Sequence, residues 1–414
     1  MDYARFTLAN GLRVIHHPVP ESNTVTLNIL YNVGARDEAQ ERTGFAHLFE
    51  HLMFGGSVNI PDYDKVVEWA GGNNNAYTNN DFTNYYISVP LENAETAFWL
   101  ESDRMLGLDF SEKSLNVQKG VVIEEFKQRC HNAPFGMLWH HLRALAYKVH
   151  PYRWPTIGLI PDHIEQASLD DVRAFYERYY HPNNAILCIS GALSELETLE
   201  LTEKWFGSIK RKAAPNPNLY PTEPEQKERR ILQTTDLLPQ NAVFMAFRTP
   251  GAQRQDWPFG SLYSELFGGT ETSPLYLKLV KEKSIFTSAE SFYMKGLSEG
   301  LFVVYGILSD SVKHETAEQA IRDLLDEYMM NAFGDEHLKR VKNQAITRLL
   351  FDQTNHMNRV QKLCYYENLG LLNSDMLDEA NMLNAVNNMD LKNWASEHLN
   401  KAQANVVYYR PQVS

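Results

Sequence analysis

The feature that most constrains the fold of this chain is an internal duplication. Residues 52–57 (LMFGGS) are echoed by residues 265–270 (ELFGGT), an offset of 213 residues. A second echo pairs Phe175 and the stretch 185–187 (AIL) with Trp394 and the stretch 404–406 (ANV), an offset of 219 residues. A repeat of this length is too long for a solenoid unit, which spans about 20–50 residues. The sequence therefore predicts two homologous domains.

Length and composition agree with two domains and place the boundary between them. A chain of 414 residues with 43% apolar content is long enough for two hydrophobic cores. Residues 211–230 concentrate proline and charge and contain little that could enter a core. We predict an N-terminal domain at 1–213, a linker at 214–230 and a C-terminal domain at 231–414.

Patterns of apolar residues in the first half predict a mixture of strands and helices. Asn10-Gly11 is a dipeptide favoured in two-residue hairpin turns, so an antiparallel sheet is expected to begin around it. Alternation and β-branched or aromatic composition predict further strands, and compact apolar patterns predict helices. A hairpin is expected at Phe6–Ile15, a strand at Thr24–Val33 and further strands within Asn75–Val89, and the helices are expected at Thr43–Phe54, Leu91–Leu108 and Ser111–Arg129.

The helix predicted at Thr43–Phe54 contains the residues that carry the chemistry. Among the ten residues 45–54 only His47, Glu50 and His51 are polar, and all three are of types found in metal sites. Residues four apart lie one turn above each other, so both imidazoles can point to one place. Burying these side chains without a partner would cost several kcal/mol, roughly the desolvation penalty of unsatisfied polar groups. A bound cation would remove that penalty. Under the first echo, Gly260, Tyr263 and Ser264 stand opposite them, so the second domain has no metal ligands there.

A catalytic zinc ion takes three protein ligands and keeps one position for water, so a third ligand must come from elsewhere. Glu125 is the candidate, because the helix at 111–129 is apolar enough to pack inward and Gln118 shares the face of Glu125 at a spacing of seven. Gln118 is expected to support Glu125 from behind the site. Glu124 points about 100° away, and Cys130 does not share that face.

The motif His47-x-x-Glu50-His51, followed by Glu125, resembles the inverted zinc motif of the pitrilysin/insulinase peptidases. The resemblance covers the whole chain, including residues 71–78 (GGNNNAYT), 121–125 (VVIEE) and 181–185 (HPNNA). It implies an α+β fold of two homologous αβ domains, each an antiparallel sheet packed against helices. It also implies peptide hydrolysis with one Zn²⁺, with Glu50 as general base, and a substrate strand pairing beside Asn75 and Ala76.

One part of the family pattern is missing. Many active members carry an Arg and a Tyr seven positions apart in the second domain, which oppose the developing oxyanion. Val280 and Thr287 occupy those positions here. The resemblance therefore implies that this is the zinc-bearing member of a pair, fully active only with a second homologous chain, identical or different. Tyr276, Tyr293 or Arg359 could replace the missing pair.

Composition and termini exclude some functions and leave others open. A net charge of −13 argues against nonspecific binding to nucleic acid or anionic membrane. Three widely spaced cysteines and no export signal in the sequence fit the cytoplasm, or the periplasm if a signal was removed. Two alternatives are a noncatalytic peptide-docking subunit of the same fold and a zinc lyase of the S-ribosylhomocysteine type. Chain length, the second copy and Glu125 count against the lyase.

Overall fold

The computed structural model describes residues 2–213, 220–238, 240–252, 254, 256–372 and 378–412. The chain folds into two compact units, each assembled from three stretches of sequence. Unit 1 contains residues 1–128, 154–220 and 351–377, and unit 2 contains residues 129–153, 221–350 and 378–414. Among the described residues, no helix combines the length and the apolar character that a membrane-spanning segment needs.

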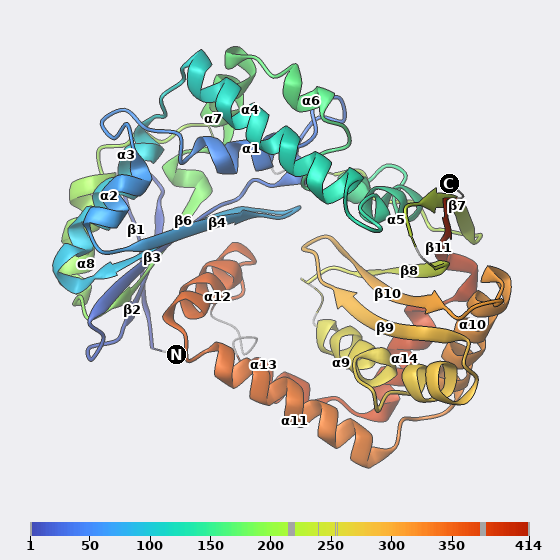
Figure 1. The fold of residues 1–414 in the computed structure, drawn as a ribbon. Coiled ribbons are helices and arrows are strands. Elements are labelled where there is room, and N and C mark those ends of the chain that lie inside the picture. Colours follow the sequence, from blue (N-terminus) through green and yellow to red (C-terminus); the bar gives the residue numbers. More distant parts are fainter. Residues whose placement is uncertain are drawn as a thin grey trace. The chain divides into compact units, whose positions relative to one another are not determined.

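Unit 1 is built on a six-stranded sheet with the order β1-β2-β6-β3-β5-β4 (Figure 1). Neighbouring strands are antiparallel except for β2 and β6, which run parallel. Strand β4 lies at one edge, with β5 as its one neighbour in the sheet. The strands are β1 (Ala4–Thr7), β2 (Arg13–Pro18), β3 (Thr24–Tyr31), β4 (Asn73–Thr78), β5 (Thr83–Pro90) and β6 (Ala185–Gly191).

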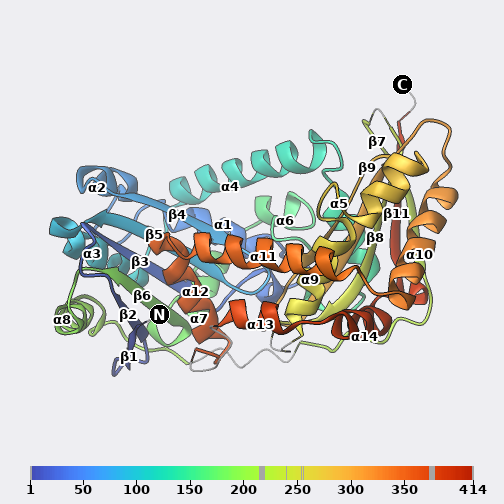
Figure 2. The ribbon, with the colours of Figure 1, turned by 90° about the horizontal axis from the view of Figure 1, so that it is seen from below.

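Helices cover both faces of this sheet. One face, with Leu27 and Ile87 among its residues, forms an apolar core with the helices that surround α1. In this layer α4 runs beside α1 and α6 (Figure 2). The helices of the layer and the helix α8 beside it are α1 (Phe45–Leu52), α2 (Tyr63–Trp69), α3 (Ala94–Leu106), α4 (Glu112–Phe126), α6 (Asp162–Glu165), α7 (Leu169–Tyr179) and α8 (Glu195–Phe206).

The opposite face of the sheet is covered by α12 (His356–Asn368), which packs on β3 and β6 (Figure 1). This face is polar for a buried surface. The amides of Asn28 and Asn84 exchange hydrogen bonds of 2.9 and 2.6 Å, and Thr26 donates to Ser88 at 3.1 Å. Both asparagines are completely buried, so the pairing satisfies groups that would otherwise be costly to desolvate.

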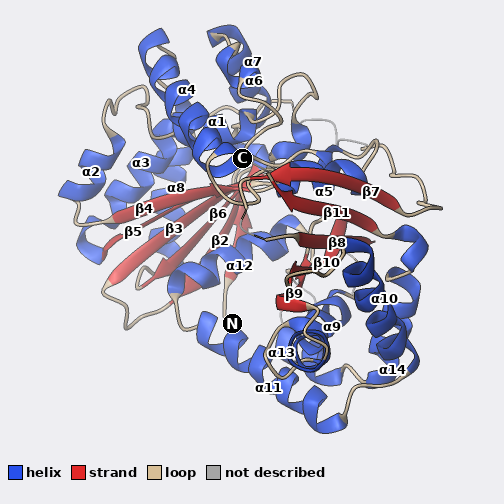
Figure 3. Ribbon diagram, turned by 45° about the vertical axis from the view of Figure 1, so that its right-hand side comes forward, coloured by secondary structure: helices blue, strands red, loops and turns tan. Residues whose placement is uncertain are grey.

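Unit 2 repeats this plan with a five-stranded sheet of order β7-β11-β8-β10-β9 (Figure 3). Apart from β1, each strand of unit 1 has a counterpart at the same place and in the same direction, including the single parallel pair, β7 with β11. The predicted α+β fold with two homologous sheet-and-helix domains is therefore confirmed. The strands are β7 (Arg230–Asp236), β8 (Ala242–Pro250), β9 (Phe286–Met294), β10 (Glu299–Leu308) and β11 (Asn405–Pro411).

The helices of unit 2 include α5, which comes from the first half of the chain and packs on β8 and β11. Leu138 and Leu142 of α5 form an apolar cluster with Phe244 and Val303 of the sheet. The helices are α5 (Leu138–Ala146), α9 (Trp257–Gly268), α10 (His314–Met330), α11 (Asp335–Asp352), α13 (Glu379–Ala385) and α14 (Asn388–His398). The last two residues of α11, after Leu350, are assigned to unit 1.

The compact units do not follow the predicted domains 1–213 and 231–414 along their whole length. Apart from Arg230, the first residue of β7, each sheet lies within its predicted domain, but α5 and α12 each belong to the unit of the other half. The physical reason is that a sheet with two buried faces needs a cover for each, and these two helices supply it across the halves. In the predicted linker 214–230, residues 214–219 lie outside the described residues and Arg230 already begins β7.

The turn at Asn10-Gly11 differs from the two-residue hairpin turn expected there. Thr7 pairs with Arg13, so the loop between β1 and β2 is longer, and of the pair only Gly11 has a positive φ, of 89°. The amide of Asn10 is buried and donates to the carbonyl oxygens of Phe206 and Ile209 at 2.8 and 3.0 Å. Asn10 therefore ties the loop to α8 instead of forming the turn itself.

Candidate metal centre

Helix α1 places His47 and His51 side by side. Phe45, Leu48, Phe49 and Leu52 fix the helix by packing into the core of unit 1. The two imidazole rings lie one turn apart with centroids 4.9 Å from each other, in an edge-to-face arrangement. Their Nε2 atoms are 3.3 Å apart. Both imidazoles thus present a ring nitrogen to one point, as the spacing predicts.

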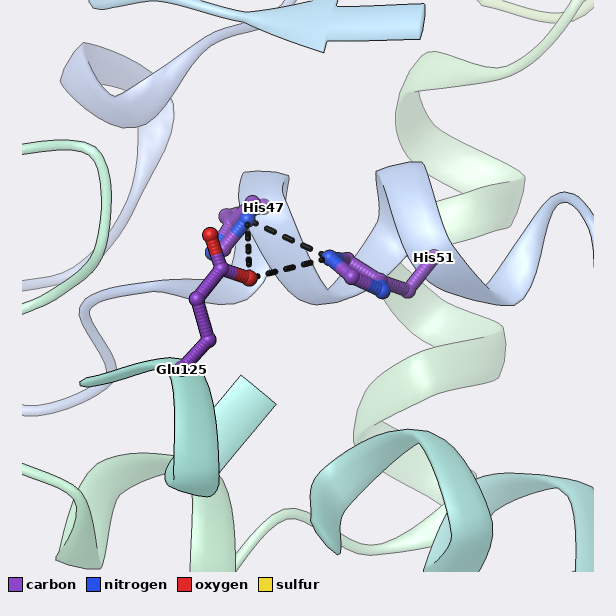
Figure 4. Close-up of side chains that lie close together, drawn as sticks. All are labelled: His47, His51 and Glu125. Atoms are coloured by element: carbon purple, nitrogen blue, oxygen red, sulfur yellow. Dashed lines mark hydrogen bonds and ion pairs between the residues drawn. The ribbon is translucent and has the colours of Figure 1, made fainter. Parts of the chain in front are cut away.

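Helix α4 brings the carboxylate of Glu125 to the same point (Figure 4). The helix is capped by Ser111, whose hydroxyl accepts from the backbone N–H of Ser114, and Leu115 and Val122 anchor it in the core. Glu125 Oε2 lies 3.4 Å from His47 Nε2 and 3.5 Å from His51 Nε2. Within the described residues, this is the one group of three His, Cys, Asp or Glu side chains placed to hold a metal ion.

The spacing of these three atoms fits a zinc ion. Ligand atoms at about 2.0–2.1 Å from a tetrahedral zinc ion are about 3.3–3.4 Å from one another. The three observed separations are 3.3, 3.4 and 3.5 Å. Three lone-pair-bearing atoms this close repel one another unless a cation or a proton lies between them. The side chains of His47, His51 and Glu125 are also largely buried, with exposed fractions of 10%, 24% and 20%, which strengthens that repulsion.

Glu50 lies on the same helix, three residues after His47, and is partly exposed. Its charge reaches the tyrosines of the neighbouring strand β5. Burial raises the pKa of Tyr86, and the negative charge of Glu50 raises it further. Glu50 is therefore a partly exposed carboxylate on the helix that carries both histidines.

Asn75 and Ala76 lie in the edge strand β4, which packs against α1. Asn75 is exposed, and its side-chain oxygen accepts a hydrogen bond of 2.8 Å from the N–H of Ala76. The N–H of Ala76 is thus satisfied by the residue before it.

On α4 and just after it, the structure places three further residues that the sequence analysis considered: Gln118, Glu124 and Cys130. Gln118 is partly buried and its amide nitrogen lies beside Gly55, just after α1. In the described part of the chain its side chain makes no hydrogen bond with Glu125, so its supporting role stays a prediction. Glu124 is exposed and 3.9 Å from Lys127. Cys130 is buried in the π-helical turn that follows α4.

The corresponding helix of unit 2, α9, has aromatic rings where the metal site would be. Gly260 stands opposite His47, and a Cβ atom on Gly260 would lie 2.7 Å from the ring of Trp394 and 2.9 Å from that of Tyr293. Tyr263, opposite Glu50, packs edge to face on Phe302. The second half therefore has no room for a ligand side chain at Gly260.

Neither position of the missing Arg and Tyr carries such a side chain, and the three candidate replacements fall in different units. At the two family positions, Thr287 lies at the start of β9 and donates to the carbonyl oxygen of Ile307 at 3.3 Å, and Val280 lies in the π-helix Leu275–Glu282. Tyr276 and Tyr293 belong to unit 2, whereas Arg359 lies on α12 in unit 1 with the candidate ligands. Arg359 donates to the carbonyl oxygen of Gln353.

One residue at the site has no signal among the motifs of the sequence. Glu38 follows the 3-10 turn Ala35–Asp37 and is buried against the start of α1, where it accepts hydrogen bonds from two backbone N–H groups. A glycine before a helix with an acidic residue six positions earlier is too common a pattern to have identified it.

Comparisons with known proteins agree over most of the chain. Residues 13–158 match the family model described as insulinase (peptidase family M16), and residues 166–345 match the model described as peptidase M16 inactive domain. The zinc protease PqqE of Helicobacter pylori is 32% identical over 343 residues, which cover 81% of this chain and 77% of that protein.

Two further relatives extend the likeness. The mitochondrial-processing peptidase subunit beta of Saccharomyces cerevisiae is 25% identical over 361 residues, covering 83% of this chain and 77% of that protein. The crystal structure of a protease from Helicobacter pylori superposes with a TM-score of 0.91 at 28% identity, covering 99% of this chain and 100% of that one.

Proposed function

The chain belongs to the insulinase family of peptidases, family M16, and on that basis we propose that it is a zinc-dependent endopeptidase of peptides or unfolded polypeptide segments. The observation that carries the proposal is the convergence of His47, His51 and Glu125 at separations that suit tetrahedral zinc. These three residues would hold the ion. Such an ion, when bound, acts as a Lewis acid and lowers the pKa of a water molecule toward neutrality.

Glu50 is the general base in this mechanism. It accepts a proton from the attacking water and then passes it to the leaving amine, so that the peptide bond is hydrolysed without a covalent intermediate. Its position on α1 keeps it within one turn of both histidines, and its partial exposure lets it reach the substrate. General acid–base catalysis by one side chain typically contributes about 10²–10⁴-fold to the rate.

The substrate is held as an added strand along β4. Strand β4 is the edge of its sheet beside α1, so an extended peptide can pair with its backbone near the metal ligands. For this pairing, Asn75 must release the N–H of Ala76 and can then bind the peptide backbone with its amide. Recognition of backbone more than side chains suits substrates of varied sequence.

A second, homologous chain completes the active enzyme. The support is the absence of the Arg and Tyr pair, since Val280 has no polar side chain and the hydroxyl of Thr287 donates to the carbonyl oxygen of Ile307. A relative reported above is named as a subunit of a processing peptidase. Whether the partner is identical or different is decided by mixing the protein with homologous chains.

The experiment compares Glu50→Gln with Glu124→Gln in purified protein, alone and mixed with homologous chains, on a library of unstructured peptides. Glu124 is the matched control because it is an exposed carboxylate on the neighbouring helix. We expect both variants to bind one zinc ion per chain, and cleavage to fall at least about 100-fold only in Glu50→Gln. Full activity of Glu50→Gln, or wild-type protein without zinc, would overturn the mechanism.

The second candidate is a noncatalytic subunit that binds peptides with the same fold. It is favoured by the match of residues 166–345 to a model described as an inactive domain and by the missing Arg and Tyr. Zinc bound at the site without cleavage in any pairing would establish this alternative.

A further inference from the structure

Glu38 connects the loop before α1 to the start of that helix. Its side chain is buried, with 8% of the residue exposed. One carboxylate oxygen, Oε2, accepts from the backbone N–H of Gly44 at 2.9 Å, and the other, Oε1, accepts from the N–H of Ala46 at 2.8 Å. Both oxygens are therefore bonded to the backbone at the start of α1.

Helix α1 depends on Glu38 because its own cap residue has no side chain. The first N–H groups of a helix have no partner within the helix, and Ser, Thr, Asp or Asn at the N-cap usually binds one of them. Here the N-cap is Gly44 with φ of 88°. The first helical hydrogen bond runs from the N–H of Leu48 to the carbonyl oxygen of Gly44. Glu38 supplies the acceptor that Gly44 lacks, and its negative charge favours the helix N-terminus.

This contact lies directly beside the candidate metal ligands. Ala46 directly precedes His47, and the helix has only eight residues. Three residues after Ala46, the carbonyl oxygen of Phe49 accepts from the hydroxyl of Tyr85 in the sheet at 3.4 Å. The helix is thus held at its beginning by Glu38 and in its second turn by the sheet, so its rotation about its own axis is restricted.

We propose that Glu38 is a positioning residue for zinc, which fixes α1 so that His47 and His51 meet Glu125 at ligand distances. This inference rests on the proposed zinc site and adds to it a residue outside the motif. Burial raises the pKa of Glu38, and the N–H groups of Ala46 and Gly44 oppose that rise. Among the described residues Glu38 has no salt-bridge partner, and a carboxyl group kept at such a cost suggests a role beyond filling space.

The test compares Glu38→Gln with Glu223→Gln in the full chain. Glu223 is a matched control in unit 2: it has 6% exposure, and its carboxylate accepts from the backbone N–H groups of Lys148, Val149 and His150 at 2.7–2.9 Å. In both variants an amide replaces a carboxylate that binds backbone donors. The melting temperature should fall in both. Zinc affinity, measured by competition with a chelator, should fall about tenfold only in Glu38→Gln, the lower end of the effect of supporting residues around a metal.

A spectroscopic readout separates positioning from general destabilisation. Co²⁺ in place of zinc gives visible absorption bands that depend on ligand geometry, so these bands should change in Glu38→Gln and stay the same in Glu223→Gln. Equal zinc affinities and equal spectra in the two variants would overturn the inference. If Glu38→Gln does not fold, Glu38→Asp is judged by the same criteria, because its shorter side chain cannot reach both N–H groups. Wild-type protein that binds no zinc would instead refute the zinc site itself.

Discussion

The buried ion pair of Glu101 and Arg104 on α3 allows a quantitative test of what holds unit 1 together. Both side chains are only 1% exposed, and Arg104 Nε donates to Glu101 Oε2 at 2.9 Å. The guanidinium lies over the rings of Tyr85, Tyr63 and Phe54, at 4.5, 4.8 and 5.4 Å from their centroids. The hydroxyl of Tyr63 donates to Glu101 at 2.8 Å. Arg104→Met would leave this carboxylate buried without its cation.

The expected cost follows from that isolated carboxylate. Removing one partner of a buried ion pair typically costs about 3–5 kcal/mol, because the remaining charge is uncompensated. For a unit of about 220 residues, 1 kcal/mol corresponds to about 2–4 °C of melting temperature. We therefore expect Arg104→Met to lower the melting temperature of unit 1 by roughly 10 °C. The double variant Glu101→Leu with Arg104→Met should recover most of the loss, because no charge remains buried.

Differential scanning calorimetry checks this prediction, with Lys204→Met as the control. Lys204 forms an exposed ion pair with Glu95, with side-chain exposures of 59% and 48%, and such pairs are worth less than about 1 kcal/mol. If Arg104→Met lowers the melting temperature no more than Lys204→Met does, the buried charge is not the source of stability. A double variant as unstable as Arg104→Met alone would show that packing around the guanidinium matters more than its charge.

Three further predictions concern metal, pH and backbone. Removing zinc with a chelator should lower the free energy of unfolding of wild-type protein by about 2.7 kcal/mol if zinc was at 100 times its Kd, and its melting temperature should fall accordingly. A His51→Ala variant should show no effect of the chelator. Burial, followed by the charge of Arg359, lowers the pKa of His17 to about 4, below its ordinary 6.5. The unfolded chain therefore binds the proton more readily, so stability present above pH 6.5 is lost as pH falls toward 4, by about 2 kcal/mol between pH 7 and 5. Urea unfolding of His17→Leu should lack this loss. Gly120→Ala, with nothing within 4 Å of the new Cβ on α4, should stabilise the protein by about 0.5–1 kcal/mol, whereas Gly44→Ala, at φ of 88°, should destabilise it by more than 1 kcal/mol in the same assay.

The convergence of the three candidate ligands was predictable because helical geometry fixes side-chain direction over short spans. A spacing of four brings His47 and His51 to one side of α1, and a common face with buried neighbours selects Glu125 over Glu124. The duplication was also visible, and it correctly predicted that two sheets of the same topology would form.

Other features depend on contacts that local patterns do not determine. The apolar face of α12 shows that the helix is buried, but it does not show that its partner is the sheet of the other half. The parallel pairing of β2 with β6 joins strands about 170 residues apart, and no periodicity within either strand reveals its neighbour. Glu38 was missed for the same reason, since its partners are backbone groups that any residue offers.

The exchange of α5 and α12 between the units has a consequence for the protein during its synthesis. The last strand of the first sheet ends at Gly191, and α12 is complete about 180 residues later, roughly 9–35 s at usual rates of translation. During that interval one face of the sheet has no helix, and on that face Asn28, Asn84 and other hydrogen-bonding side chains lie among apolar ones such as Leu30 and Ile186. The second sheet is made after its helix α5 and has an apolar face toward it. The sheet that is synthesised before its covering helix thus has the more polar of the two helix-covered faces, which is less prone to aggregate.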